Sequence, residues 1–349
     1  MPNWIGDLVM ATPLISDVKK LYPQALLTVL VKRDLADLLN HHPDIDHVIT
    51  FEKRHKLSSL LQTRKVVKHL KNKEYDLAIL TTNSFSSAFW FWSSGIKNII
   101  GYVGKNRSWL LSHKIPHLKN PSDAIHMVDK YKHLLSSLQQ EPSQTVPKLF
   151  LKEDEKTGLK LFFQKENIPL ENGYICINPG AAYGSAKCWP KERFNFLTQK
   201  LITETDKEIL YIGPSSFQNL IHDICLDLPT KRLHNLAGKT DIRLMMTIIQ
   251  ESSLLITNDS GPLHVADALE VPTVAIFGST NDLATGPYQK KGICLNKRVF
   301  CSPCYKRTCP LDFRCMLEIS VDEVYAAVHK TLGSYGNQDD KTLITLLKT

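Results

Sequence analysis

A polar, glycine-containing turn at residues 257–269 is the part of the sequence best suited to chemistry. It reads T-N-D-S-G-P-L-H-V-A-D-A-L and follows the apolar run 253–256, so it predicts a buried strand, a tight turn and the start of a helix. Asp259 and Ser260 are residue types that cap helix starts, and Gly261 lets a ligand approach the backbone. Free amides and the positive end of the helix dipole would meet here, which suits a diphosphate. The alternative is an ordinary capped helix.

A lysine-bearing loop and two smaller turns occupy similar positions. The loop P-G-A-A-Y-G-S-A-K-C-W-P spans residues 179–190 and places Lys187 beside backbone amides, where a flexible cation suits a phosphate. The alternative is a surface lysine. The turn G-P-S-S after the apolar run 208–213 is a weaker signal. Near the chain start Asp7 precedes a helix, where a carboxylate can cap the helix or act as a general base.

These turns require a particular kind of fold. Short apolar runs alternate with helical patterns in both halves, which predicts parallel sheets built from βαβ units. Ligands of such doubly wound sheets bind at the carboxyl ends of the strands, so two such domains predict a site in the cleft between them. We expect strands at residues 26–31, 47–51, 77–81, 98–102, 174–178, 208–213, 253–257 and 273–277.

The length and composition are those of a two-domain globular protein. The chain has 349 residues, of which 43% are hydrophobic and 22% charged, and no apolar run approaches a membrane span. The start lacks the features of a secretory signal, so we expect a cytoplasmic protein. A polar segment around residues 139–173 is typical of a boundary. The predicted domains are residues 1–150 and 170–330, followed by a C-terminal tail or helix at 331–349.

The charge is positive and spread along the chain. The formal net charge is +8, and the basic cluster at residues 53–73 contains no acid. Such a cluster is compatible with an anionic substrate, an acidic membrane surface, nucleic acid or simply a solvated face. The sequence shows no aromatic-basic repeat and no nucleic-acid-binding motif, so we expect no nucleic-acid partner.

Five motifs in order carry a resemblance to a known family. They are P-N-W-I-G-D at residues 2–7, N-S-F-S-S-A at 83–88, the 179–190 loop, N-L-A-G-K-T at 235–240 and T-N-D-S-G-P-L-H at 257–264. In this set the chain resembles glycosyltransferase family 9, the ADP-heptose:lipopolysaccharide heptosyltransferases. The resemblance implies an α/β fold of the GT-B type, in which two Rossmann-like doubly wound domains face a cleft and the second binds most of the nucleotide sugar.

The resemblance also implies a reaction and its partners. Heptose (L-glycero-D-manno-heptose) would pass from ADP-heptose to a heptose of the lipopolysaccharide inner core, on Kdo-lipid A, with inversion and with no cofactor or metal required. The enzyme would touch the inner membrane peripherally from the cytoplasmic side. Asp7 would be the base, and Lys187 would stabilise the departing ADP. The donor-binding residues would be Gly180, Gly238, Thr240, Asp259, Ser260, Gly261 and His264, and the acceptor-binding residues Asn83 and Ser84.

Some of these roles have alternatives. His264 could support its helix instead of reaching a phosphate. The apolar-aromatic segment 84–95 could belong to the core or to a face that meets lipid. A nucleotide-sugar 2-epimerase shares the two-domain plan, and a catalytically weakened scaffold homologue would share the sequence.

The first departure from the family lies at the chain start. In the family a complete strand precedes the P-N-W-x-G-D turn, whereas only three residues stand before Trp4 here. That strand is central in a doubly wound sheet, and its loss would leave unpaired backbone groups that cost about 1 to 3 kcal/mol each. We therefore expect the first strand to be missing and the native start to lie upstream.

The second departure is a cysteine-rich segment, C-S-P-C-Y-K-R-T-C-P-L-D-F-R-C. Four thiols within fifteen residues can surround one tetrahedral metal, and a reducing cytoplasm favours metal over disulfide. Structural zinc, an iron–sulfur cluster, a redox-labile loop and no bound partner all remain open from the spacing alone. The four residues are Cys301, Cys304, Cys309 and Cys315.

Overall fold

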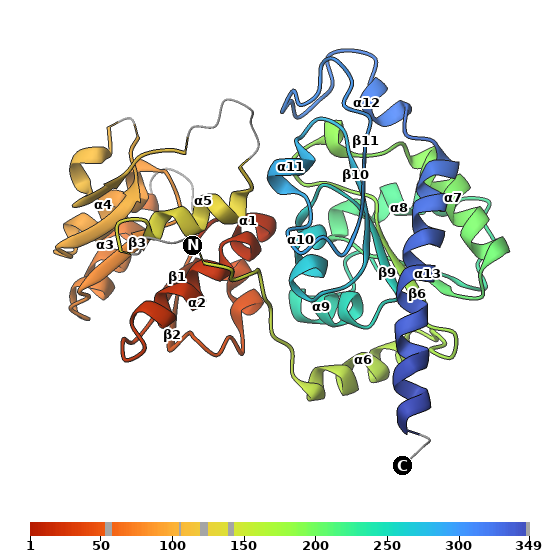
Figure 1. Ribbon diagram of the computed structural model, residues 1–349, viewed down its shortest axis with the longest axis horizontal. Coiled ribbons are helices and arrows are strands. Elements are labelled where there is room, and N and C mark those ends of the chain that lie inside the picture. The colour runs from red at the N-terminus through yellow and green to blue at the C-terminus, as the bar shows by residue number, and fades with distance from the viewer. Residues whose placement is uncertain (53–57, 105, 119–124, 139–142, 347–349) are drawn as a thin grey trace. The chain divides into compact units, whose positions relative to one another are not determined.

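The chain folds into two compact α/β units, residues 1–149 and residues 150–349. The computed structural model describes residues 1–52, 58–104, 106–118, 125–138 and 143–346 (Figure 1). Every described strand pair in the two units is parallel, which confirms the predicted fold class. Residues 53–57 of the basic cluster lie outside the described residues.

Unit 1 places its described strands in two separate sheets, β1–β2 and β3–β4–β5. In this part of the chain no described strand joins β1 to β3. The strands are β1 (Thr28–Lys32), β2 (His47–Phe51), β3 (Leu77–Leu80), β4 (Asn98–Tyr102) and β5 (His113–Ile115). The helices are α1 (Ile5–Met10), α2 (Thr12–Leu21), α3 (Ser58–Lys71), α4 (Phe85–Ser93) and α5 (Met127–Lys132), with short 3-10 turns η1 (Arg33–Leu39), η2 (Ser108–Leu110) and η3 (His133–Leu135).

Unit 2 is built on one six-stranded parallel sheet, in the order β11-β10-β9-β6-β7-β8. This is the strand order of a doubly wound fold, and the order reverses between β6 and β9. The strands are β6 (Tyr174–Asn178), β7 (Glu208–Tyr211), β8 (Leu233–Asn235), β9 (Leu254–Asn258), β10 (Thr273–Phe277) and β11 (Gly292–Asn296). The helices are α6 (Glu153–Lys165), α7 (Lys191–Glu204), α8 (Gln218–Cys225), α9 (Ile242–Gln250), α10 (Gly261–Ala268), α11 (Asp282–Thr285), α12 (Arg314–Leu317) and α13 (Val321–Leu346), with 3-10 turns η4 (Ser185–Lys187) and η5 (Ser215–Phe217).

The core of unit 2 explains why its central strands are continuous apolar runs. β6, β9 and β10 are buried along their whole length because helices cover both faces of the sheet. One face packs against α7, α8 and α13, and Leu263 of α10 packs on the other face against Ala275 and Phe277. α13 runs unbroken across residue 330. None of the described helices is both long and apolar enough to cross a bilayer.

Candidate donor and catalytic sites

Two asparagines at the ends of β6 and β9 join the loops that follow these strands. Asn178 donates through Nδ2 to the hydroxyl oxygens of Thr257 (3.1 Å) and Ser260 (2.8 Å). In the other direction, Asn258 donates to the carbonyl of Pro179 at 2.6 Å. Both side chains are almost fully buried, so these bonds are shielded from water. The 179–190 loop is therefore held beside the 257–264 turn at the point where the strand order reverses.

A tryptophan anchors the far end of the same loop. Trp189 is buried, and its backbone N–H donates to Asn258 Oδ1 at 3.0 Å. Its indole N–H donates to the carbonyl of Ile319 at 3.0 Å, and its ring packs edge-on against Phe194. This anchoring fixes the backbone two residues after Lys187.

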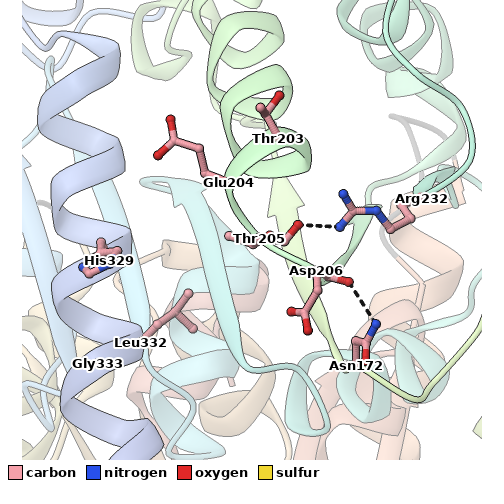
Figure 2. A pocket seen from close by; sticks show the side chains of 9 residues that line it. All are labelled: Asn172, Thr203, Glu204, Thr205, Asp206, Arg232, His329, Leu332 and Gly333. Atoms are coloured by element: carbon pink, nitrogen blue, oxygen red, sulfur yellow. Dashed lines mark hydrogen bonds between the residues drawn. The ribbon is translucent and has the colours of Figure 1, made fainter.

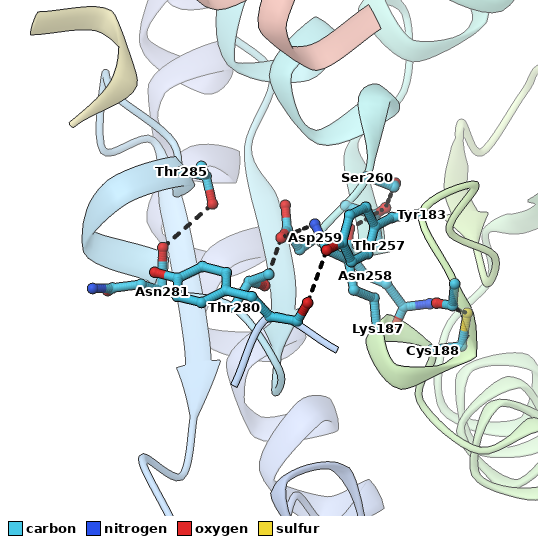
Figure 3. Close-up of polar contacts among 12 residues, drawn as sticks. Tyr183, Lys187, Cys188, Thr257, Asn258, Asp259, Ser260, Thr280, Asn281 and Thr285 are labelled. Atoms are coloured by element: carbon cyan, nitrogen blue, oxygen red, sulfur yellow. Dashed lines mark hydrogen bonds and ion pairs between the residues drawn. The ribbon is translucent and has the colours of Figure 1, made fainter. Parts of the chain in front are cut away.

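The loop delivers Lys187 onto a buried carboxylate. Lys187 Nζ lies 2.5 Å from Asp259 Oδ2, and Thr280 donates its hydroxyl to the same oxygen at 2.6 Å (Figure 3). The side chains of Lys187 and Asp259 are only 14% and 4% exposed. The three residues follow β6, β10 and β9, so the carboxyl ends of three strands build this cluster.

The start of α10 has no side-chain cap. Ser260 occupies the N-cap position with extended backbone angles, yet its side chain makes no capping bond in the structure. Its hydroxyl is instead bonded to Asn178, and the Asp259 carboxylate bonds Lys187 and Thr280. Ser260 therefore occupies the expected N-cap position without making the side-chain capping bond, and Asp259 does not cap the helix. The first amides of a helix need partners, and an anion can supply them here.

The remaining residues expected to bind the donor lie along the same carboxyl ends of the strands or in the elements that follow them. Gly180 follows β6, and a Cβ at this glycine would lie 2.2 Å from the ring of Phe217, so packing alone requires glycine. Gly238 has φ +72° and lies beyond β8 with Thr240, two strands away from β6. His264 is buried within α10. The structure thus brings Lys187 to the 259–261 turn and places Gly238 and Thr240 further along the edge.

In unit 1, Asp7 lies in the first turn of α1 and contacts a tyrosine. Tyr131 of α5 hydrogen-bonds the Asp7 carboxylate, and its pKa is raised well above the usual value, first by burial and then by the negative charge of Asp7. The hydroxyl therefore stays protonated and acts as the donor. The N-cap of α1 is Trp4, which makes no side-chain capping bond in the structure.

The two residues expected to meet the acceptor follow β3. Asn83 is exposed. Ser84 is the N-cap of α4, where its Oγ accepts the backbone N–H of Ser87 at 3.2 Å. This local bond accounts for the serine at that position without any ligand.

The four clustered cysteines line one small cavity of about 70 Å³ beside Ser279 and Ala186. All four are free thiols. The pKa of Cys315 is raised to about 11 by burial and by the neighbouring thiols. Within the described parts of the chain, no three Cys, His, Asp or Glu side chains are arranged to hold a metal ion.

A larger cavity of about 710 Å³ lies at the opposite edge of the unit 2 sheet (Figure 2). Its lining includes Asn172, Glu204, Asp206 and Arg232, which precede β6, β7 and β8. The guanidinium of Arg232 donates to the carbonyls that end α7, including that of Thr205 at 2.6 Å. This contact closes the end of the helix, at the amino-terminal strand ends of the sheet.

Sequence reasoning missed two residues of these sites. Thr280 follows β10, and the strand-end rule that selected Lys187 and Asp259 applies to it equally. Tyr131 reaches Asp7 only through the packing of α5 against α1, and no local pattern in the sequence marks it.

Comparisons with known proteins agree with this geometry. The sequence profile of glycosyltransferase family 9 (heptosyltransferase) matches residues 63–313. Lipooligosaccharide heptosyltransferase 2 of Haemophilus ducreyi is 32% identical over 305 residues, covering 84% of this chain and 86% of the relative. Lipopolysaccharide heptosyltransferase 2 of Escherichia coli is 30% identical over 300 residues, covering 83% and 84%.

A solved structure is similar along nearly the whole chain. The E. coli ADP-heptose lipopolysaccharide heptosyltransferase II structure has a TM-score of 0.80 and 26% identity, and the match covers 95% of this chain and 97% of that one. Two parallel α/β units, the motif loops gathered at the carboxyl strand ends and the matched profile all agree. The chain belongs to glycosyltransferase family 9, the heptosyltransferases, and is a transferase enzyme.

Proposed function

We propose that this enzyme transfers L-glycero-D-manno-heptose from ADP-heptose to a heptose of the lipopolysaccharide inner core. The observation that carries the proposal is the buried Lys187–Asp259 pair beside the uncapped start of α10, at the reversal of the strand order. A cation and free helix amides together suit a diphosphate. The relatives named for ADP-heptose and lipopolysaccharide supply the substrate class.

The donor half of the reaction follows from the charges. When the bond between the anomeric carbon and ADP breaks, its electron pair leaves with the diphosphate, and negative charge grows there. Lys187 and the amides at Gly261 stabilise this charge, and donors preset in this way are worth a few kcal/mol each. This arrangement calls for no metal ion. Asp259, held by Thr280, binds hydroxyls of the heptose and favours the cationic character of its anomeric carbon.

The acceptor half uses Asp7 as the general base. The acceptor hydroxyl attacks the anomeric carbon from the side opposite to ADP, which inverts the configuration, and its proton passes to the Asp7 carboxylate. Tyr131 positions that carboxylate through its hydrogen bond. Asn83 and Ser84 contribute to acceptor binding at the end of β3. Gly180, Gly238, Thr240 and His264 complete the donor side.

An exposed aromatic surface on unit 1 supports a peripheral location at the inner membrane. The rings of Phe85, Phe89, Trp92 and Trp109 form a chain with centroid distances of 6.0, 6.1 and 5.4 Å. We call these four residues the aromatic row. Three of them are between 46% and 61% exposed. Water-exposed tryptophans of this kind are favoured at the level of lipid headgroups.

The other face of α4 packs into the core, and the neighbouring helix α3 presents a basic surface. Trp90 and Phe91 pack into the core, so the segment 84–95 is partly core and partly surface. α3 lies against α4, where Trp90 Nε1 donates to Thr63 Oγ1 at 3.0 Å. Among residues 62–71 of α3 every exposed position is basic, which suits the anionic cytoplasmic leaflet. These residues are Arg64, Lys65, Lys68, His69 and Lys71.

The transfer reaction is tested by mass spectrometry. Purified protein, ADP-heptose and mono-heptosylated Kdo-lipid A in excess EDTA should give a product heavier by one heptose. Replacing Lys187 by Gln removes a donor aimed at the leaving group, so kcat should fall about 100-fold or more. Product formation only with added metal, or a Lys187→Gln enzyme as fast as wild type, would contradict the account. Conversion of the donor without acceptor would favour the 2-epimerase alternative.

Asp7→Asn tests the base. The amide cannot accept the proton, so kcat should fall by about 100-fold to 10,000-fold, while the KM for ADP-heptose changes little. Asp34→Asn is the matched control, because Asp34 is an exposed carboxylate of the same unit that pairs with Lys32. A kcat for Asp7→Asn equal to that of the control would remove Asp7 from the mechanism and favour the scaffold alternative.

Membrane contact is tested by co-sedimentation with vesicles containing phosphatidylglycerol. The double variant Trp92→Ala/Trp109→Ala should bind at least about 30-fold more weakly, since each buried indole contributes on the order of 1 to 2 kcal/mol and the two together about 2 to 4 kcal/mol. Phe196→Ala is the control, an equally exposed aromatic of unit 2. If the double variant and the control bind alike, the aromatic row is not the contact surface. Heptose transfer to a de-acylated acceptor should be unchanged in these variants, whichever result the vesicle-binding experiment gives.

A further inference from the structure

The cysteine-rich segment, residues 301–315, here called the cysteine loop, is bonded to both sides of the donor site. Its Tyr305 donates a backbone N–H to the carbonyl of Ser279 at 2.8 Å, next to Thr280. Its carbonyls accept from the Tyr183 hydroxyl at 2.8 Å and from the Ala186 N–H at 3.0 Å. The loop thus bridges the turn after β10 and the turn that carries Lys187.

Two glycines show how closely the cysteine loop packs against the turns after β6 and β10. A Cβ on Gly184 would lie 2.2 Å from the carbonyl oxygen of Arg307, a distance that no side chain tolerates. A Cβ on Gly278 would lie 3.0 Å from the sulfur of Cys315, and Ser302 donates to the Gly278 carbonyl at 2.5 Å. The loop is therefore packed into the site at fixed positions.

Two cations stand over one aromatic ring at this junction. The Tyr183 ring centroid lies 4.9 Å from Lys187 Nζ and 5.1 Å from the guanidinium carbon of Arg307. Stacking on an aromatic ring is a favourable way to hold a guanidinium in one orientation. Tyr183 therefore brings the charge of Arg307 into the neighbourhood of Lys187.

The two cations differ in how their charge is balanced. Lys187 is already neutralised by the buried Asp259 carboxylate. Arg307 is exposed, and across the described residues no carboxylate forms an ion pair with it. A diphosphate arriving beside Lys187 meets the negative charge of Asp259 as well, so a further cation on the protein would add to its attraction to the site.

We propose that Arg307 is that cation, a donor-binding residue that grips the diphosphate of ADP-heptose, and that the cysteine loop positions it. This inference rests on the proposed function. A guanidinium presents a planar fork of N–H donors that matches two phosphate oxygens, whereas a lysine supplies a point charge. Arg307 makes its contact with the phosphates both before and after the glycosidic bond breaks, so it acts on binding more than on the chemical step.

The test compares Arg307→Gln with Lys306→Gln, which removes the same charge from the adjacent exposed residue of the same loop. Arg307→Gln should weaken binding of ADP and raise the KM for ADP-heptose by about tenfold, with kcat within about threefold of wild type. Affinity for adenosine, which has no phosphate, should not change. Lys306→Gln should bind ADP like wild type, and Arg307→Lys should recover part of the loss.

Several results would overturn the assignment. Unchanged ADP affinity in Arg307→Gln would remove Arg307 from the site, and an equal loss in both variants would indicate a general charge effect. Loss of adenosine binding together with ADP binding would show that the variant disturbs the fold of the site. Failure of the proposed function looks different, because the wild-type protein itself would then transfer no heptose.

Discussion

The buried ion pair between Lys187 and Asp259 is the interaction on which the donor site depends. Removing both charges from water is costly, and it is offset only when the contact is close and further hydrogen bonds complete it. The 2.5 Å contact and the hydrogen bond from Thr280 meet that condition. The pair locks three separate chain segments together, so it decides where the loop after β6 lies relative to the start of α10. It also leaves the site without a surplus positive charge of its own.

The strand order and hydrogen bonds of unit 2 hold the loops around this ion pair in place. The reversal of strand order between β6 and β9 leaves the ends of these strands without a connecting helix directly above them, which is where ligands of this fold bind. Asn178 and Asn258 use this space to bind the two loops to one another. Because Asn178 takes the hydroxyl of Ser260, the start of α10 stays open to an anion. The cysteine loop then supplies, in Arg307, the cation that the neutralised pair lacks.

The sequence predicts the apolar strands of both units and misses three strands that lie at sheet edges. β2, β4, β6 and β10 occupy the predicted residues because each is a short apolar run with turn residues behind it. β5, β8 and β11 escape prediction, since the first two are only three residues long and β11 is half buried at the edge of its sheet.

Some residues of the candidate site can likewise be predicted from the sequence, and others cannot. Lys187, Asp259 and Ser260 are predictable because a strand end followed by a polar turn marks a ligand position in this fold. The sequence cannot show which of two plausible partners a polar side chain binds. Ser260 and Asp259 are both residue types that cap helices, yet their side chains bind other side chains instead. Tyr131 and Arg307 act through contacts between segments distant in the chain, so their roles follow only from the packing.

The most direct test of the donor site is a crystal structure of the protein with ADP. We predict that the diphosphate lies over the start of α10, with a phosphate oxygen about 3 Å from Lys187 Nζ and the adenosine extending along the carboxyl ends of β6, β7 and β8. Phosphates found away from this turn, for example in the cavity at the opposite edge of the sheet, would contradict the account.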